Sequence, residues 1–356
     1  MNRAEEILAD KAALESQLNT PININESGFA NKISANEKEL SLALKIVIIL
    51  GALISGLFFM AFLAASGFFE SSVAMLTVSF VMFGLAIFME LKYAATISAN
   101  AFNLVFYIIG FSALGAALTW LDVDENITIT ILLILSFAVL AFSKSHITTF
   151  SAGIGSNFLI FILIVTNDYY ELLNLHVIVL AFICYGLFKY EGAFIKLPIN
   201  YSRMFYPLRS AFSISLVFAL ATLGFNHLAE LHMRLTWLSG TVILSLIAYS
   251  LFETNISGSE KAIRIRQSAV AAIILCPLVF APAVLGGLFI TLLSFRTNYR
   301  TGMALGIVCF LYFIGQFYYD LKITLFYKSL LMLGTGLLFL VIQFILHQKN
   351  YFDEKA

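Results

Sequence analysis

The stretch "CPLVFAPAV", residues 276–284, decides how often this chain crosses a membrane. It lies in the middle of an apolar run, and its two prolines, Pro277 and Pro282, each lack the backbone N–H that a helix interior needs. The prolines therefore either interrupt one long broken helix or close a tight hairpin between two short spans, at residues 267–281 and 283–295. A broken helix would also free backbone carbonyls that could bind an ion.

Other apolar segments lie on both sides of this stretch, and most have the length that a span requires, about 20 residues. They lie near residues 42–68, 72–89, 101–120, 127–142, 147–166, 171–188, 207–225, 235–252, 302–318 and 324–346. The sequence therefore predicts an all-α protein, a polytopic transmembrane helical bundle. It has about 12 spans if the prolines close a hairpin, and 11 if they interrupt one helix.

The charged residues of the loops favour twelve spans. If the polar N-terminus is cytoplasmic, twelve spans place most loop cations on the same side: Lys92, Lys144, Lys189, Lys196, Arg203, Arg209, Lys261, Arg264, Arg266, Arg296 and Arg300. Only Arg234 and Lys322 then lie clearly outside, as the positive-inside rule expects. Eleven spans would move Arg296 and Arg300 outside. We therefore expect twelve spans, with both termini in the cytoplasm.

The domain organisation follows from these spans. Residues 1–41 form a polar cytoplasmic segment with a short amphipathic helix and a linker, residues 42–347 form the transmembrane domain, and residues 348–356 form a cytoplasmic tail. The longest cytoplasmic loop, 189–206, separates two halves, 42–188 and 207–346. This 6+6 layout resembles that of major-facilitator transporters, although their Asp-Arg-x-Gly-Arg loop signature is absent here.

The composition agrees with a membrane protein. Hydrophobic residues make up 60% of the chain and charged residues 12%, about half the 25% that is typical of soluble domains. Lysine plus arginine equals aspartate plus glutamate, 21 each, so the net charge gives no reason to expect a nucleic-acid partner. We expect the lipid bilayer as the main surrounding.

Motifs for cofactors and catalysis are missing from the sequence. Cys184, Cys276 and Cys309 lie in apolar runs without metal-ligand spacing. The sequence also lacks the phosphate-loop, nucleophile-elbow, zinc-protease and dinucleotide motifs. We therefore expect no metal, no cofactor and no enzyme activity. A membrane enzyme would depend on the outer-face groups Asp168, His227, Glu230 and His232.

Lys328 is the clearest charge inside a predicted span, and intramembrane charges are candidates for function. It lies six residues beyond Lys322, about 9 Å deeper at about 1.5 Å per residue, so its ammonium group can also snorkel to the headgroups. The functional alternative is a pocket open to the outer face that binds a polar or anionic headgroup. Its candidate residues are Gln316, Tyr318, Tyr319, Asp320, Lys328, Ser329 and His176.

Acidic residues are missing from the depth of every predicted span, which argues against a standard proton- or sodium-coupled antiporter. Glu90 and Arg209 lie at the cytoplasmic ends of their segments, where side chains of this kind serve as interfacial anchors. An ion would then have to bind elsewhere, for example at backbone carbonyls beside Pro277 and Pro282.

The stretch "YYDLKITLFYKSLLMLGTGLLFL", residues 318–340, resembles a bacterial integral-membrane family that is known only as a domain of unknown function. The residues that carry this resemblance are Tyr318, Tyr319, Leu321, Thr324, Leu325, Lys328, Ser329 and Gly334. It extends over roughly the last 75 residues, including Ala281 and Pro282, and the rest matches only in hydropathy. The resemblance implies a possible partner, since members are often encoded beside a smaller membrane-anchored protein with a Gly-Asp-Tyr repeat motif.

Two functions are consistent with these features. The first is a carrier or flippase for a small or lipid-like molecule in the bacterial cytoplasmic (inner) membrane, which the spans, short loops and proline break favour. The alternative is a non-catalytic membrane subunit or scaffold that binds a partner envelope protein. The implied neighbour protein and the lack of a deep carboxylate favour this second function.

Overall fold

The computed structural model describes residues 42–93, 97–143, 145–196, 199–224, 235–254 and 261–320, and the single residues Phe326, Ser329 and Leu333. All regular elements within these ranges are helices, which confirms the all-α class. The predicted N-terminal segment, the C-terminal tail and most of the segment 324–346 lie outside the described residues.

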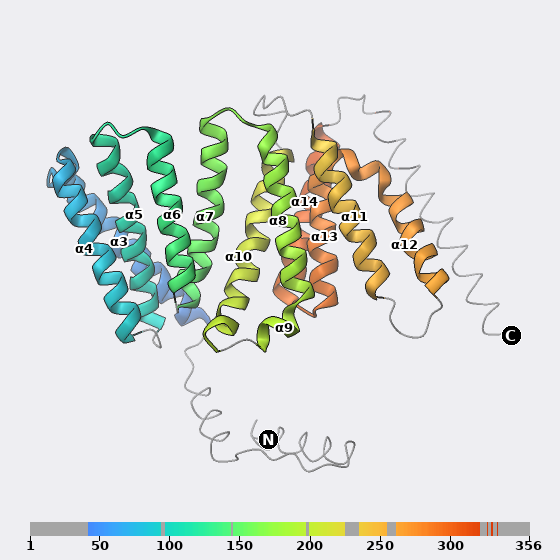
Figure 1. Ribbon diagram of the computed structural model, residues 1–356, viewed down its shortest axis with the longest axis horizontal. Coiled ribbons are helices and arrows are strands. Elements are labelled where there is room, and N and C mark those ends of the chain that lie inside the picture. The colour runs from blue at the N-terminus through green and yellow to red at the C-terminus, as the bar shows by residue number, and fades with distance from the viewer. Residues whose placement is uncertain are drawn as a thin grey trace, which may run out of the picture. The chain divides into compact units, whose positions relative to one another are not determined.

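Nine helices in the described part of the chain are long and apolar enough to cross a membrane. They are α3 (Leu42–Ala65), α4 (Ser72–Tyr93), α5 (Ile97–Trp120), α6 (Glu125–Phe142), α7 (His146–Thr166), α8 (Glu171–Lys189), α10 (Ile199–Gly224), α11 (Thr236–Thr254) and α14 (Arg300–Asp320) (Figure 1). Each corresponds to a predicted segment. The chain is therefore a membrane protein, while the total of twelve spans stays a prediction.

The proline stretch separates two shorter helices. Helix α12 (Lys261–Leu275) continues into the 3-10 helix η3 (Cys276–Phe280), and α13 (Pro282–Arg296) follows. Each proline lies at the start of its element, where its missing N–H removes no helical hydrogen bond. Helices α12 and α13 run in opposite directions on either side of the turn (Figure 1). The prolines thus form a hairpin rather than a kink in one continuing helix.

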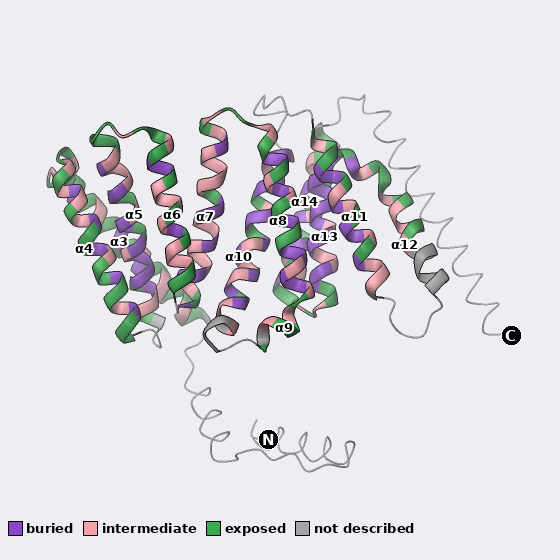
Figure 2. Ribbon diagram, in the orientation of Figure 1, coloured by how far each residue is buried: buried purple, intermediate pink, exposed green. Residues whose placement is uncertain are grey.

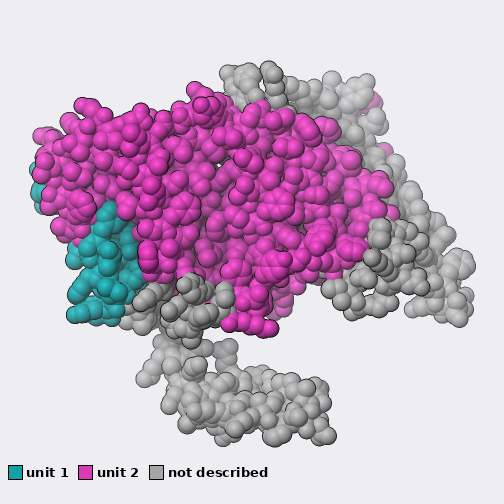
Figure 3. Space-filling model, viewed as in Figure 1, with its two compact units in different colours: residues 1–68, 82–109 teal, residues 69–81, 110–356 magenta. Residues whose placement is uncertain are grey.

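The described chain falls into two compact units (Figure 3). Unit 1 takes its described residues from the ranges Met1–Phe68 and Met82–Ile109, and unit 2 takes them from Phe69–Val81 and Gly110–Ala356. In unit 1, Gly56 of α3 faces the side chain of Val105 on α5, so a larger residue there would collide with it. Most of α3 otherwise presents apolar side chains outward, as a lipid-facing helix does.

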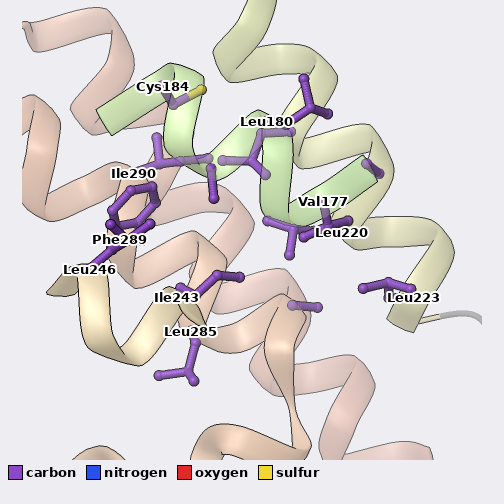
Figure 4. Packing of buried hydrophobic residues seen from close by; sticks show 14 of the residues in the cluster. Val177, Leu180, Cys184, Leu220, Leu223, Ile243, Leu246, Leu285, Phe289 and Ile290 are labelled. Atoms are coloured by element: carbon purple, nitrogen blue, oxygen red, sulfur yellow. The ribbon is translucent and has the colours of Figure 1, made fainter. Parts of the chain in front are cut away.

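Unit 2 contains a core built from α8, α10, α11 and α13 (Figure 4). Leu180, Leu220, Ile243 and Phe289, one from each helix, are fully enclosed in it. Helix α13 is the most enclosed, with ten of its 15 residues buried, and Figure 2 shows this concentration of buried residues. Lipid tails are as apolar as these side chains, so the hydrophobic effect contributes little to helix association in a membrane. Close packing of the side chains holds such a core together instead.

Small residues bring α13 and α14 into close contact. A Cβ on Gly287 would lie 2.8 Å from the backbone of Phe310, and a Cβ on Gly306 would lie 2.6 Å from the backbone nitrogen of Thr291. Only glycine therefore permits this separation at either position. The short turn Thr297–Tyr299 joins the two helices, so they form one tightly packed antiparallel pair.

Candidate functional site

Three helices of unit 2 end at one carboxylate. Glu253, the next-to-last residue of α11, lies with its Oε1 2.7 Å from the Nζ of Lys189 at the end of α8. Its Oε2 lies 3.0 Å from the Nη1 of Arg296 at the end of α13. Tyr185, one turn before Lys189, donates its hydroxyl proton to the same Oε2 at 2.9 Å. We call Lys189, Glu253, Arg296 and Tyr185 the Glu253 network.

The ammonium group of Lys189 also lies among three aromatic rings. Its Nζ is 5.5 Å from the ring centroid of Tyr185, 5.6 Å from that of Tyr190 and 5.0 Å from that of Tyr249. It donates a long hydrogen bond to the hydroxyl of Tyr249 at 3.5 Å. Negative ring faces within about 6 Å attract a cation. We call Tyr185, Tyr190 and Tyr249 the tyrosine cage.

The Glu253 network lies at the molecular surface, close to the edge of the spans. The side chains of Lys189, Glu253 and Arg296 remain 21–27% exposed. Water and salt therefore screen these charges partly, which makes the contacts weaker and easier to break than a buried ion pair. They join the ends of α8, α11 and α13 without burying a charge in the spans.

A second charged cluster lies at the same ends of the helices. The side chain of Arg209 on α10 is 4% exposed, and its Nη1 lies 3.1 Å from Oε2 of Glu191 on the short helix α9 (Glu191–Ile195). Tyr299, in the turn after α13, places its ring centroid 4.0 Å from the guanidinium carbon. The rings of Phe188, Phe205 and Tyr206 surround the same carbon at 5.3–5.4 Å.

Arg209 is held by stacking more than by hydrogen bonds. Its Nε and Nη1 are buried and donate no hydrogen bond, although Nη1 lies 3.1 Å from Oε2 of Glu191. Tyr299 also shares a hydrogen bond of 2.9 Å with the hydroxyl of Ser210, one residue further along α10. The Arg209 cluster thus connects the α13–α14 turn to α10 through enclosed aromatic contacts.

The opposite ends of α8 and α11 are also joined at an acidic residue. Glu171, the first residue of α8, accepts hydrogen bonds from the backbone N–H of Leu235 at 3.2 Å and from the side-chain amide of Asn174 at 3.3 Å. Asn174 in turn accepts one from Ser239 of α11 at 3.3 Å. We call these hydrogen bonds the Glu171 contact.

The predicted outer pocket is described only in part. Gln316 packs its amide against Gly224 of α10, and both polar atoms of that amide are buried without a hydrogen bond. The rings of Tyr318 and Tyr319 lie 5.7 Å apart edge to face, and Tyr319 is largely exposed. Lys328 and the side chain of Asp320 lie outside the described residues.

The remaining two residues of that prediction add no binding geometry. Ser329 donates its hydroxyl proton to the carbonyl of Phe326 in its own helical turn. His176 is half-buried on α8, which packs against α10 and α11, whereas Gln316 lies on α14, which packs against α13 and α10. The pocket therefore stays a prediction.

The proline turn satisfies its own backbone. The Ala281 N–H donates to the carbonyl of Leu278 at 2.8 Å, and the Val284 N–H donates to the carbonyl of Ala281 at 3.0 Å. The Val279 carbonyl lies directly against Gly240 of α11, which has no Cβ to obstruct it. Pro277 and Pro282 thus shape a packed hairpin turn.

The Glu90 side chain is more buried than its position near the end of a predicted span indicated. Its side chain in unit 1 is 7% exposed, and its Oε2 accepts hydrogen bonds from the Tyr107 hydroxyl at 3.3 Å and from the Asn103 amide at 3.5 Å. Both donors belong to α5. An enclosed carboxylate therefore does occur between α4 and α5, which corrects the expectation of an anchor at the membrane surface.

Sequence reasoning missed Glu253 as a site residue, although it placed Lys189 and Arg296 on one side of the membrane. The available signal was a single acid at the end of a predicted span, on the same predicted side of the membrane as several cations. No metal-binding group of three or more histidine, cysteine or acidic residues occurs in the described ranges.

Comparison with known proteins gives a family and no activity. Residues 41–349 match the family model described as Domain of unknown function (DUF4401). No curated protein and no solved structure matches the chain. Because the match covers most of the sequence, the chain belongs to this family, as the resemblance at its C-terminal end predicted.

Proposed function

We propose that this member of the DUF4401 family is a membrane carrier for a small or lipid-like molecule, and that the Glu253 network closes one end of its transport path. The observation that carries the proposal is that one carboxylate joins the ends of three core helices, α8, α11 and α13. We place the protein in the bacterial cytoplasmic membrane, with this end on the cytoplasmic side and without enzyme activity.

The chemistry of the network suits a gate that opens and closes. A carrier must separate helix ends repeatedly to expose its binding site to either side. Contacts that are fully buried would resist this, because separating a buried ion pair leaves desolvated charges. The partly exposed Lys189, Glu253 and Arg296 can instead exchange their partners for water when the helices separate.

Cys184 provides a native reporter for this opening. It lies five residues before Lys189 on α8, about 7.5 Å along the helix axis, and only 1% of it is exposed. Of the other two cysteines, Cys309 is buried and Cys276 is exposed. A protein with Cys276→Ser and Cys309→Ser therefore carries a single thiol directly behind the Glu253 network.

The experiment measures how fast a membrane-impermeant maleimide labels Cys184 in lipid nanodiscs, where both faces are accessible. We expect slow labelling in the parent protein and faster labelling in Glu253→Gln, because the carboxylate that joins the three helices is lost. Glu191→Gln is the matched control. It makes the same change at the same ends, but its partner Arg209 joins α9 to α10.

Equal labelling rates in the parent, Glu253→Gln and Glu191→Gln proteins would contradict the gate. The alternative function, a non-catalytic subunit that binds a membrane-anchored partner, would then be favoured if such a protein co-purifies with every variant. The exposed face of α3, with Leu57, Phe58 and Phe62, is a surface where such a partner or lipid would lie.

A further inference from the structure

The groups around the Lys189 ammonium form a site that suits a cation in general and not lysine in particular. Three tyrosine rings face its Nζ, and a carboxylate oxygen lies 2.7 Å away. We propose that the tyrosine cage together with Glu253 is a binding site for the primary ammonium group of a ligand, and that Lys189 is its resident occupant when no ligand is bound.

The cage differs from an ordinary lysine–aromatic contact. Lys92 on α4 also places its Nζ over a ring, 5.1 Å from the centroid of Phe88, but this is one ring on the same helix. At Lys189 the rings come from two helices and the residue after α8, and Tyr185 and Tyr249 also meet edge to face at 6.0 Å. Rings, hydroxyls and a carboxylate thus converge on a single ammonium position.

A ligand can reach this position from outside. Tyr185, at 9% exposure, forms the enclosed wall of the cage, while Tyr190 and Tyr249 are 55% and 48% exposed and form its rim. The Lys189 side chain itself is 22% exposed. Its long, flexible stem can therefore swing outward and leave the cage open without moving a helix.

Charge balance narrows the ligand class. Because Lys189 is tethered beside the cage, its effective concentration there is in the millimolar range or above, so a simple amine competes poorly. Displacement would also leave Lys189 without the Glu253 carboxylate, while Arg296 would share that carboxylate with the ligand. A ligand that carries a phosphate close to its ammonium group balances these charges, since the phosphate can pair with Lys189 and Arg296.

Phosphoethanolamine is the simplest molecule with this chemistry. It occurs either free or as the headgroup of a phospholipid, and the site lies at the end of the spans, where headgroups lie. The ammonium site itself does not depend on transport. A second step, in which the bound ligand opens the Glu253 network, rests on the carrier proposal. In that case the ligand also identifies the class of the transported or regulating molecule.

The test empties the cage and refills it. In Lys189→Ala we expect the thermal unfolding midpoint to fall by a few degrees, and millimolar ethylammonium chloride to restore at least half of that loss. Ethanol, which is uncharged and of similar size, should restore nothing. Lys189→Ala with Tyr249→Leu, or with Glu253→Gln, should lose the response. Lys92→Ala is the matched control and should show no ethylammonium response.

A second variant keeps the test decisive if Lys189→Ala does not fold. Lys189→Met retains most of the stem, removes the charge and should show the same rescue. Failure of ethylammonium to stabilise either variant more than Lys92→Ala would overturn the ammonium site. The result for Cys184 labelling is separate, so loss of the gate and loss of the site can be told apart.

The source of the ligand is tested in the protein with native Lys189. Free phosphoethanolamine should raise its unfolding midpoint in phosphatidylcholine nanodiscs if the ligand is soluble. Nanodiscs of phosphatidylethanolamine with the same acyl chains should raise it without added ligand if the headgroup is the source. A midpoint that responds to neither would overturn this ligand class, even where ethylammonium rescues Lys189→Ala.

Discussion

The two ends of the α8–α11 pair are joined at two different carboxylates. At one end Lys189, Glu253 and Arg296 form ion pairs that are partly exposed. At the other, Glu171 accepts a hydrogen bond from the first backbone N–H before α11, and Asn174 bonds to Ser239. Hydrogen bonds to the backbone hold a fixed geometry, whereas exposed ion pairs depend on the solvent. Under the carrier proposal, we therefore expect the Glu253 end to be the one that opens.

The largest effect is expected from Arg209→Ala, beside the network but in the enclosed Arg209 cluster. The substitution removes a 4% exposed guanidinium from four aromatic rings and leaves a cavity among them. We expect a loss of about 2–4 kcal/mol in the free energy of unfolding. Denaturant unfolding measures this loss. A loss no larger than that of Glu253→Gln would show that the more enclosed cluster does not contribute more to stability.

Glu253→Gln should have the next largest effect, and on opening more than on stability. Two cations on different helices lose their shared carboxylate, so we expect maleimide labelling of Cys184 to rise by about tenfold. Labelling kinetics in nanodiscs give the value directly. The comparison between the ends fails if Glu171→Gln raises the labelling rate as much.

High salt should imitate that substitution. Raising the ionic strength from about 0.1 M to about 1 M shortens the Debye length from about 10 Å to about 3 Å. We expect a few-fold faster labelling of Cys184 in the parent protein and no salt response in Glu253→Gln. Glu171→Gln should keep the full response, because its contact lies at the other end.

Glu171→Gln itself should change little. The amide oxygen of glutamine can still accept the hydrogen bond from the N–H of Leu235, so this link between α8 and α11 survives. We expect the free energy of unfolding to stay within about 0.5 kcal/mol of the parent value. Glu171→Ala removes the acceptor, and it should unfold at a clearly lower denaturant concentration than Glu171→Gln.

The smallest effect concerns alkaline pH at the Glu171 end. Tyr170 donates its hydroxyl proton to Asp168 at 2.7 Å, and this hydrogen bond raises the pKa of the Tyr170 phenol above its ordinary value. A raised folded-state pKa contributes stability below the ordinary pKa, and that contribution is lost as the pH rises through the folded value. The loss of stability above about pH 10 should therefore be slightly smaller in Tyr170→Phe, as unfolding midpoints measured across this range would show.

Hydropathy and charge were enough to predict most of the fold. Each of the nine long helices matches a predicted segment, because the length and apolarity of a span are local properties of the sequence. The break at the proline stretch was also predictable, because Pro277 and Pro282 fit the first turn of a helix and not its interior. The span count stays open because the segment 324–346 lies largely outside the described residues.

The candidate site was less predictable because its contacts are distant in sequence. Glu253 is 64 residues from Lys189 and 43 from Arg296, and no periodicity relates positions so far apart. The sequence placed both cations on one side of the membrane but gave no pairing. Glu90 shows the same limit, since its enclosure comes from Tyr107 and Asn103 on the next helix.

The glycine contacts between α13 and α14 have a mechanical consequence. With Gly287 against the Phe310 backbone and Gly306 against Thr291, the two helices cannot slide past each other and should behave as a stiff lever. Arg296 lies at one end of this lever. Gln316 is 16 residues beyond Arg300, about 24 Å along α14. Under the carrier proposal, a displacement that begins when Arg296 leaves Glu253 would therefore reach the unpaired amide of Gln316 near the other end of α14.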